Sequence, residues 1–209
     1  MSDNPGRVDI HYVLDKLYYS HDNPRDKGTG FERFIKSFLV TEPLYAGRFE
    51  QVWMWSDWPE RGSRPDHGID LVARERDTGD LVAVQCKFFD PSAALPKGEI
   101  DSFLAESGKH PFRSRLLVTT AGRLNSAAEA AIEDQQIPVN VIGLEDLVGS
   151  TLDWAQFDPS TPEVLATLGR KRLRPHQRTA IDAVRAGLVE HDRGQLIMAC
   201  GTGKTFTSL

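Results

Sequence analysis

Residues Asp66–Lys87 read DHGIDLVARERDTGDLVAVQCK and contain two runs of strand-forming residues. The runs 69–75 and 81–89 are rich in aliphatic residues, and the residues between them, RDTGD, are typical of a turn. Apolar runs separated by a short turn signal indicate a β-hairpin. We therefore predict two antiparallel strands at the centre of the fold.

Polar side chains mark one end of this hairpin. Alternate residues of a strand point to the same face, so Gln85 and Lys87 share a face of the second strand. If Arg76 lies opposite Leu81, then Asp70 lies opposite Lys87, about 5 Å away, with Gln85 on the diagonal. A three-residue loop or a bulge would shift this register. The pattern predicts that an acid, an amide and an ammonium group meet at the hairpin end.

These three groups suit a site for a hard cation. Mg²⁺ takes oxygen ligands, commonly one or two carboxylates together with water and phosphate. We expect the Asp70 carboxylate, the Gln85 amide oxygen and a backbone carbonyl near Cys86 to hold it, and Lys87 to stabilise developing negative charge. Taken singly, an Asp before a strand and a Lys on a strand are more typical of structural roles. Their coincidence on one face favours function.

Segments on both sides of the hairpin follow helix and strand patterns. Apolar residues recur at helical spacing in 8–20 and 31–39, and FEQVWMW at 49–55 alternates like a strand. After the hairpin we predict helices over 100–110, 124–136 and 144–150, and strands over 115–120 and 138–143. This order predicts an α/β fold with a mixed sheet flanked by helices.

The C-terminal segment carries a phosphate-binding signature. A predicted strand, QLIMA, runs directly into CGTGKT. The backbone N–H groups of Gly201, Thr202 and Gly203 would surround the phosphates of ATP, with Lys204 reaching the β and γ phosphates and Thr205 binding Mg²⁺. The sequence contains no later strand with the acid that hydrolysis requires, so 170–209 alone is not expected to hydrolyse ATP. We expect the chain to be the N-terminal portion of a longer polypeptide.

GFERFI at 30–35, DHGIDL and QCK together resemble the Mrr-like branch of the PD-(D/E)xK nucleases, in which the last acidic position is commonly Gln. The resemblance covers about 28–148 and implies a restriction-endonuclease-like fold. It implies that Asp70, Gln85 and Lys87 form the catalytic core of a DNA endonuclease, assisted by Glu32. Asp66, in the dipeptide "PD", lies in the preceding loop and ranks below Asp70.

LRPHQRTAI at 173–181, followed by CGTGKT, resembles the start of superfamily 2 helicases, whose glutamine, here Gln177, binds adenine. The resemblances, together with two prolines and weak periodicity in 150–169, divide the chain into four parts. They are an N-terminal helix and loop at 1–27, an Mrr-like nuclease domain at 28–149, a linker or strap at 150–169 and an incomplete RecA-like P-loop segment at 170–209.

A nuclease joined to a helicase motor resembles the N-terminal part of type ISP restriction–modification enzymes. The resemblance implies a Mg²⁺-dependent endonuclease coupled to ATP-driven translocation. Its partners would be double-stranded DNA and the remainder of the polypeptide, with motor, methyltransferase and target-recognition domains. One alternative is a nuclease-helicase of a DNA defence or repair system without methylation. Another is a non-catalytic DNA-binding module that guides a motor.

Composition limits these functions further. The net charge of −5 means that DNA contacts depend on local basic groups. The two cysteines, Cys86 and Cys200, lie far apart and indicate a reducing cytoplasm, and no run of membrane-spanning length is present. In the loop before the hairpin, Arg61, Arg64 and His67 could contact DNA phosphates or simply be solvated. Three tryptophans, Trp53, Trp55 and Trp58, could stack on bases, although packing in the core is favoured for Trp53 and Trp55.

Overall fold

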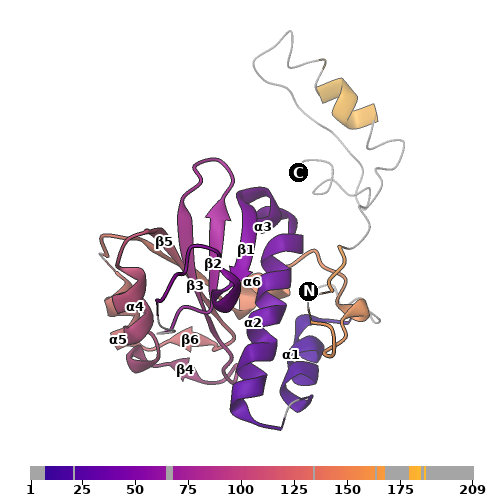
Figure 1. The fold of residues 1–209 in the computed structure, drawn as a ribbon. Helices are drawn as coiled ribbons and strands as arrows, with labels where there is room; N and C mark the ends of the chain where they lie inside the picture. The colour runs from indigo at the N-terminus through magenta and orange to yellow at the C-terminus, as the bar shows by residue number, and fades with distance from the viewer. Residues whose placement is uncertain are drawn as a thin grey trace. The chain divides into compact units, whose positions relative to one another are not determined.

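The computed structural model describes residues 8–20, 22–64, 68–133, 135–162, 164–167, 179–184 and 186. The chain divides into two compact units, Met1–Leu168 and Gly169–Leu209. In the second unit the described residues 179–184 and 186 are helical. The first unit contains the candidate site and is shown in Figure 1.

A mixed sheet forms the centre of the first unit. Its five strands run in the order β1-β2-β3-β5-β7, with antiparallel pairing from β1 to β3 and parallel pairing from β3 to β7. The strands are β1 Phe49–Met54, β2 Leu71–Glu75, β3 Leu81–Lys87, β5 Phe112–Thr119 and β7 Val139–Ile142. The predicted hairpin is β2-β3, and the predicted mixed α/β sheet is confirmed.

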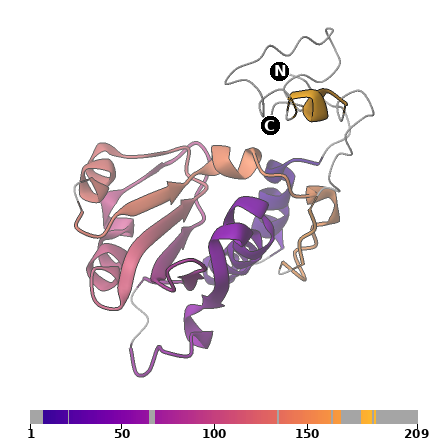
Figure 2. The same cartoon turned by 90° about the horizontal axis from the view of Figure 1, so that it is seen from above.

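Helices cover both faces of this sheet, as Figure 2 shows from above. They are α1 Ile10–Tyr19, α2 Pro24–Thr41, α3 Pro43–Arg48, α4 Asp101–Ser107, α5 Ser126–Ile132 and α6 Leu144–Val148, with short 3-10 turns η1 Trp55–Asp57, η2 Lys97–Glu99 and η3 Trp154–Gln156. A second, two-stranded parallel sheet pairs β4 Ala94–Leu95 with β6 Arg123–Leu124. We did not predict α3 or this small sheet.

Helix α2 supplies the largest part of the core on one face. It begins after Asn23, whose side chain accepts a hydrogen bond from the Asp26 N–H (2.9 Å), and Pro24 occupies its first turn. Both features are favoured at helix N-termini because the first N–H groups have no partner within the helix. The apolar stripe of the helix is buried against the sheet: Phe31, Phe34, Ile35, Phe38 and Leu39. The opposite, polar side of α2 is thereby directed outward.

Two predicted domain boundaries differ from the packing of this unit. Residue 28 lies inside α2, so no break separates 1–27 from the nuclease-like domain. Leu152, Trp154 and Phe157 are buried in the main core, with the Trp154 ring 5.7 Å from that of Phe34. Part of the segment 150–169 is therefore a strap across the nuclease-like unit and not a free linker.

Candidate active site

The register of the β2-β3 hairpin differs from the predicted one by two residues. Arg74, and not Arg76, lies opposite Leu81. Residues 76–80 form a longer turn, in which the Glu75 N–H donates to the Asp80 carbonyl (2.9 Å). A shift of two residues leaves every side chain on its predicted face, because the strand period is two. It moves Asp70 from a position opposite Lys87 to one next to Gln85 and Cys86.

Asp70 lies immediately before β2 and is bound tightly to β3. Its Oδ2 accepts a hydrogen bond from the Cys86 N–H at 2.6 Å, and its own N–H donates to the Val84 carbonyl at 2.9 Å. Its carbonyl accepts from the Trp55 N–H at 2.8 Å, which ties it to η1 as well. The half-buried carboxylate is therefore held in one position at the end of the hairpin.

Gln85 is a buried polar residue whose acceptor oxygen lacks a donor. The residue is 3% exposed, and no group of the described chain donates to its Oε1. Gly68 faces its amide: a Cβ built there would lie 3.3 Å from Nε2, and the positive φ of +81° also favours glycine. A buried acceptor without a donor costs about 1–3 kcal/mol. Such an oxygen is chemically suited to a cation.

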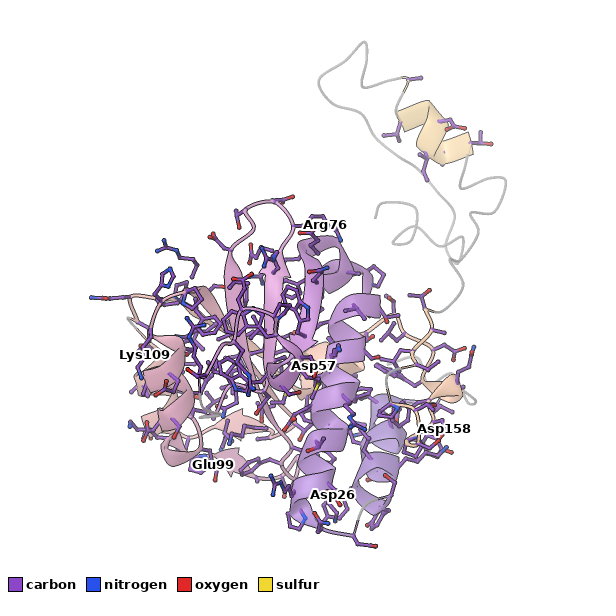
Figure 3. The ribbon with its side chains drawn as sticks, viewed as in Figure 1. Asp26, Asp57, Arg76, Glu99, Lys109 and Asp158 are labelled. Carbon is purple, nitrogen blue, oxygen red and sulfur yellow. The ribbon has the colours of Figure 1, made fainter. Side chains whose placement is uncertain are left out.

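Lys87 ends strand β3 and forms an ion pair with Glu99. The Nζ to Oε2 distance is 3.0 Å, and the Lys87 side chain is 20% exposed. Glu99 is the last residue of η2. This turn lies between two fully buried residues, Leu95 before it and Ile100 after it. Figure 3 shows Glu99 at the lower end of the sheet, away from Arg76 in the hairpin turn.

We did not predict Glu99 from the sequence. It lies twelve residues after Lys87, in a turn whose position depends on how the small β4-β6 sheet packs. The nearest sequence signal is the short KGEID run before a helix, which is equally typical of an exposed helix start.

Glu32 reaches the site from α2. It lines a cleft of about 540 Å³ together with Asp70, and η1 forms the opposite wall. The pKa of the Cys86 thiol is raised well above its usual value, first by burial and then by the negative charges of Asp70 and Glu32, while Lys87 opposes the shift. These three charged groups therefore lie within electrostatic range of one thiol.

The oxygen donors of this region fit Mg²⁺. Asp70 and Glu32 supply carboxylates, and Gln85 supplies an amide oxygen that lacks a donor. In the described part of the chain, no three His, Cys, Asp or Glu side chains are placed so that they could hold a metal ion by themselves. Mg²⁺ needs no such cluster, since it commonly keeps several waters beside one or two carboxylates. The backbone carbonyl near Cys86 remains a predicted ligand.

The other sequence candidates fare differently. Arg64 is exposed, donates to the Glu60 carbonyl (3.0 Å) and lies over the Trp58 ring at 5.2 Å, and its contact with DNA stays a prediction. Trp55 and Trp58 are buried, so the prediction that these two rings stack on bases is wrong. Several candidates lie outside the described residues: Asp66, His67, Gln177, Gly201, Thr202, Gly203, Lys204 and Thr205.

Two family models match separate parts of the chain. A family described as "Restriction endonuclease" matches residues 40–164, and one described as "Type III restriction enzyme, res subunit" matches 170–209. Glu32 precedes the first match. None of the curated proteins compared with the chain matches it. In the described residues no helix has the length and apolarity to cross a membrane.

Two solved structures are similar over most of the chain. The ATP-dependent type ISP restriction-modification enzyme LlaBIII bound to DNA is 41% identical with a TM-score of 0.77, over 93% of this chain and 12% of that enzyme. The chain thus spans about an eighth of that relative's length. The MspJI restriction endonuclease in complex with a 27-mer oligonucleotide is 17% identical with a TM-score of 0.41, over 100% and 42% of the two chains.

Proposed function

The chain belongs to the restriction endonuclease family that matches residues 40–164, and we propose that this part is a Mg²⁺-dependent endonuclease that hydrolyses DNA phosphodiesters. The helicase-like start of a res subunit follows at 170–209. The single observation that supports the proposal most is that the fixed carboxylate of Asp70 lies at the hairpin end beside Gln85, whose buried Oε1 has no donor among the described residues.

The chain's own residues divide the chemistry among them. Asp70, Gln85 and Glu32 would hold the cation, which when bound acidifies water and neutralises phosphate charge. Lys87 presents an ammonium group to the same region, where it stabilises the negative charge that develops on the phosphate oxygens. Glu99 holds that ammonium in place through the 3.0 Å ion pair.

The ATP-dependent part of the proposal concerns the longer polypeptide. Residues 170–209 would form the beginning of a motor domain that translocates on DNA and delivers the nuclease, with ATP and Mg²⁺ bound by Gln177, Gly201, Thr202, Gly203, Lys204 and Thr205. Methyltransferase and target-recognition domains would follow. The similarity to a DNA-bound type ISP enzyme supports this arrangement. We propose residues 28–149, extended by the strap to about 167, as the nuclease domain, acting in the cytoplasm.

Plasmid cleavage tests the nuclease assignment. The full polypeptide with Mg²⁺ and ATP should cut plasmid DNA, and Asp70→Asn should lower the rate at least about a hundredfold, as losses of key charge-stabilising groups do. Asparagine keeps the acceptor for the Cys86 N–H, so the fold should survive. Asp80→Asn, in the exposed turn at the other end of the hairpin, is the matched control. Equal cleavage by Asp70→Asn and wild type would refute the site and favour the non-catalytic DNA-binding alternative.

A further inference from the structure

Two arginines border the cleft that holds Glu32 and Asp70. Arg25 and Arg33 both lie on α2, line the cleft and are exposed. Among the described residues, neither guanidinium has an ion-pair partner. Arg48 differs, because it is paired with Glu75, and so does Arg74, which is paired with Glu60. The cleft therefore has two uncommitted cations at its edge.

Helix geometry sets the spacing of these two cations along α2. Arg25 precedes Glu32 by seven residues, so the two lie on nearly one stripe of the helix, separated by about 10 Å of axis. Arg33 follows Glu32 directly. A DNA strand carries one phosphate per about 3.4 Å of axis, so the 12 Å or so between Arg25 and Arg33 corresponds to roughly three phosphates.

Small residues line the cleft between Arg25 and Glu32. A Cβ added at Gly28 would meet no atom within 4 Å, and Gly28 and Thr29 line the cleft between Arg25 and Glu32. Glycine inside a helix is unfavourable by about 1 kcal/mol relative to alanine, and no positive φ requires it at this position. The small residue leaves room for a chain to lie across α2.

Charge decides which ligand suits this edge. Three carboxylates face the cleft, those of Glu32, Asp57 and Asp70, and would repel a polyanion unless a cation were bound. Guanidinium groups bind phosphate through paired N–H donors, and Arg25 and Arg33 sit at the margins of the acidic centre. The whole chain, with a net charge of −5, supplies no general attraction for DNA.

We propose that Arg25 and Arg33 bind the backbone phosphates on the two sides of the phosphodiester to be cut, with the strand lying across Gly28 and Thr29. The proposal rests on the proposed nuclease function and assigns the phosphate contacts to α2. The loop candidate Arg64, by contrast, is engaged with Trp58 and Glu60. Binding through Arg25 and Arg33 is independent of DNA sequence.

Salt-dependent binding of a short duplex to the 209-residue chain tests this assignment. Each phosphate contact contributes about 0.9 to the slope of log K against log salt. Arg25→Gln and Arg33→Gln should each lower the slope by about one and weaken binding about fivefold at 0.15 M salt, equally for all sequences. Arg113→Gln, at the opposite end of the sheet from Lys87, is the control and should bind like wild type.

A second variant tests the path of the strand. Gly28→Leu replaces a glycine that is unfavourable inside a helix, and the added Cβ would meet no atom within 4 Å, so its thermal stability should equal or exceed that of wild type. It should weaken duplex binding while leaving the salt slope unchanged, because the leucine side chain occupies the proposed path of the strand without removing a charge. If Arg25→Gln, Arg33→Gln and Gly28→Leu all bind like wild type, the assignment is overturned.

The outcome is separable from that of the nuclease proposal. Asp70→Asn should keep the wild-type salt slope and lose cleavage. If the arginine variants lose slope while the wild-type full polypeptide fails to cut DNA, the phosphate contacts stand and the nuclease function fails. If the wild type cuts and the arginine variants keep the full slope, the phosphate contacts fail and the nuclease function stands.

Discussion

One buried oxygen distinguishes this site from an ordinary hairpin end. Gln85 occupies a position where every neighbour in β3 from Leu81 to Val84 is a buried apolar residue. An amide there is unfavourable unless it has a partner, and its Oε1 has no donor in the described chain. From the sequence we predicted that Gln85 belongs to the site and which face of the strand it occupies. Only the structure shows that no described group donates a hydrogen bond to its Oε1.

Replacing the Gln85 amide should have different effects on the free energy of unfolding and on DNA cleavage. Gln85→Leu removes a buried acceptor that lacks a donor, so the free energy of unfolding should equal that of wild type or exceed it by about 1 kcal/mol. Cleavage should fall at least about tenfold, because a cation ligand is lost. Chemical denaturation and plasmid cleavage measure the two quantities.

Ser114 offers a matched control for that variant. Its Oγ is also buried and has no hydrogen-bond partner in the described part of the chain, and Ser114 lies opposite Val82 on the neighbouring strand. Ser114→Ala should be similarly neutral for stability and should leave cleavage unchanged. If Gln85→Leu instead unfolds easily and its folded fraction still cuts DNA, Gln85 is a structural residue.

Glu99 gives a second prediction at the level of single residues. Glu99→Gln keeps a hydrogen-bond acceptor near Lys87 but removes the charge of the ion pair. We expect kcat to fall roughly tenfold with KM nearly unchanged, because the ammonium acts on charge that develops only in the transition state. Asp101→Asn, which breaks the neighbouring exposed pair with Lys97, should leave kcat unchanged. A kcat of wild-type size for Glu99→Gln would exclude a positioning role.

Elements show most clearly which features the sequence predicts and which it leaves open. The β2-β3 hairpin, the helical stripe of α2 and the later helix–strand order were all predicted, because hydrophobic periodicity and turn residues mark them in the sequence. The register was wrong by two residues, since the length of the 76–80 turn depends on hydrogen bonds such as Glu75 to Asp80. The β4-β6 sheet and η2 were missed, because two-residue strands carry no periodic signal.

The strap after α6 leads to a prediction about folding. Its Leu152, Trp154 and Phe157 are buried in the core, and Glu42 accepts hydrogen bonds from the Ser150 hydroxyl and the Thr151 N–H. A chain that ends after residue 149 should lose more than about 3 kcal/mol of stability, since truncating one buried aromatic side chain already costs about that much. A chain that ends after 167 should keep it. Equal unfolding midpoints for the two chains would show that the strap is dispensable.

The chain joins two parts that match different protein families. The family matches identify a restriction endonuclease at 40–164 and a res-subunit start at 170–209. The two compact units divide at 168, close to the gap between the matches. The net charge of −5 predicts that DNA contacts come from local groups, and the groups we propose are two exposed arginines beside an acidic cleft.

Titration of the 209-residue chain with Mn²⁺, followed by electron paramagnetic resonance, tests whether Asp70 and its neighbours form a single cation site. Mn²⁺ favours the same oxygen ligands as Mg²⁺ and reports directly on bound ion. We predict a site in the wild type that Mg²⁺ displaces, that Asp70→Asn abolishes and that Asp80→Asn leaves intact. Identical Mn²⁺ binding by wild type and Asp70→Asn would contradict the account.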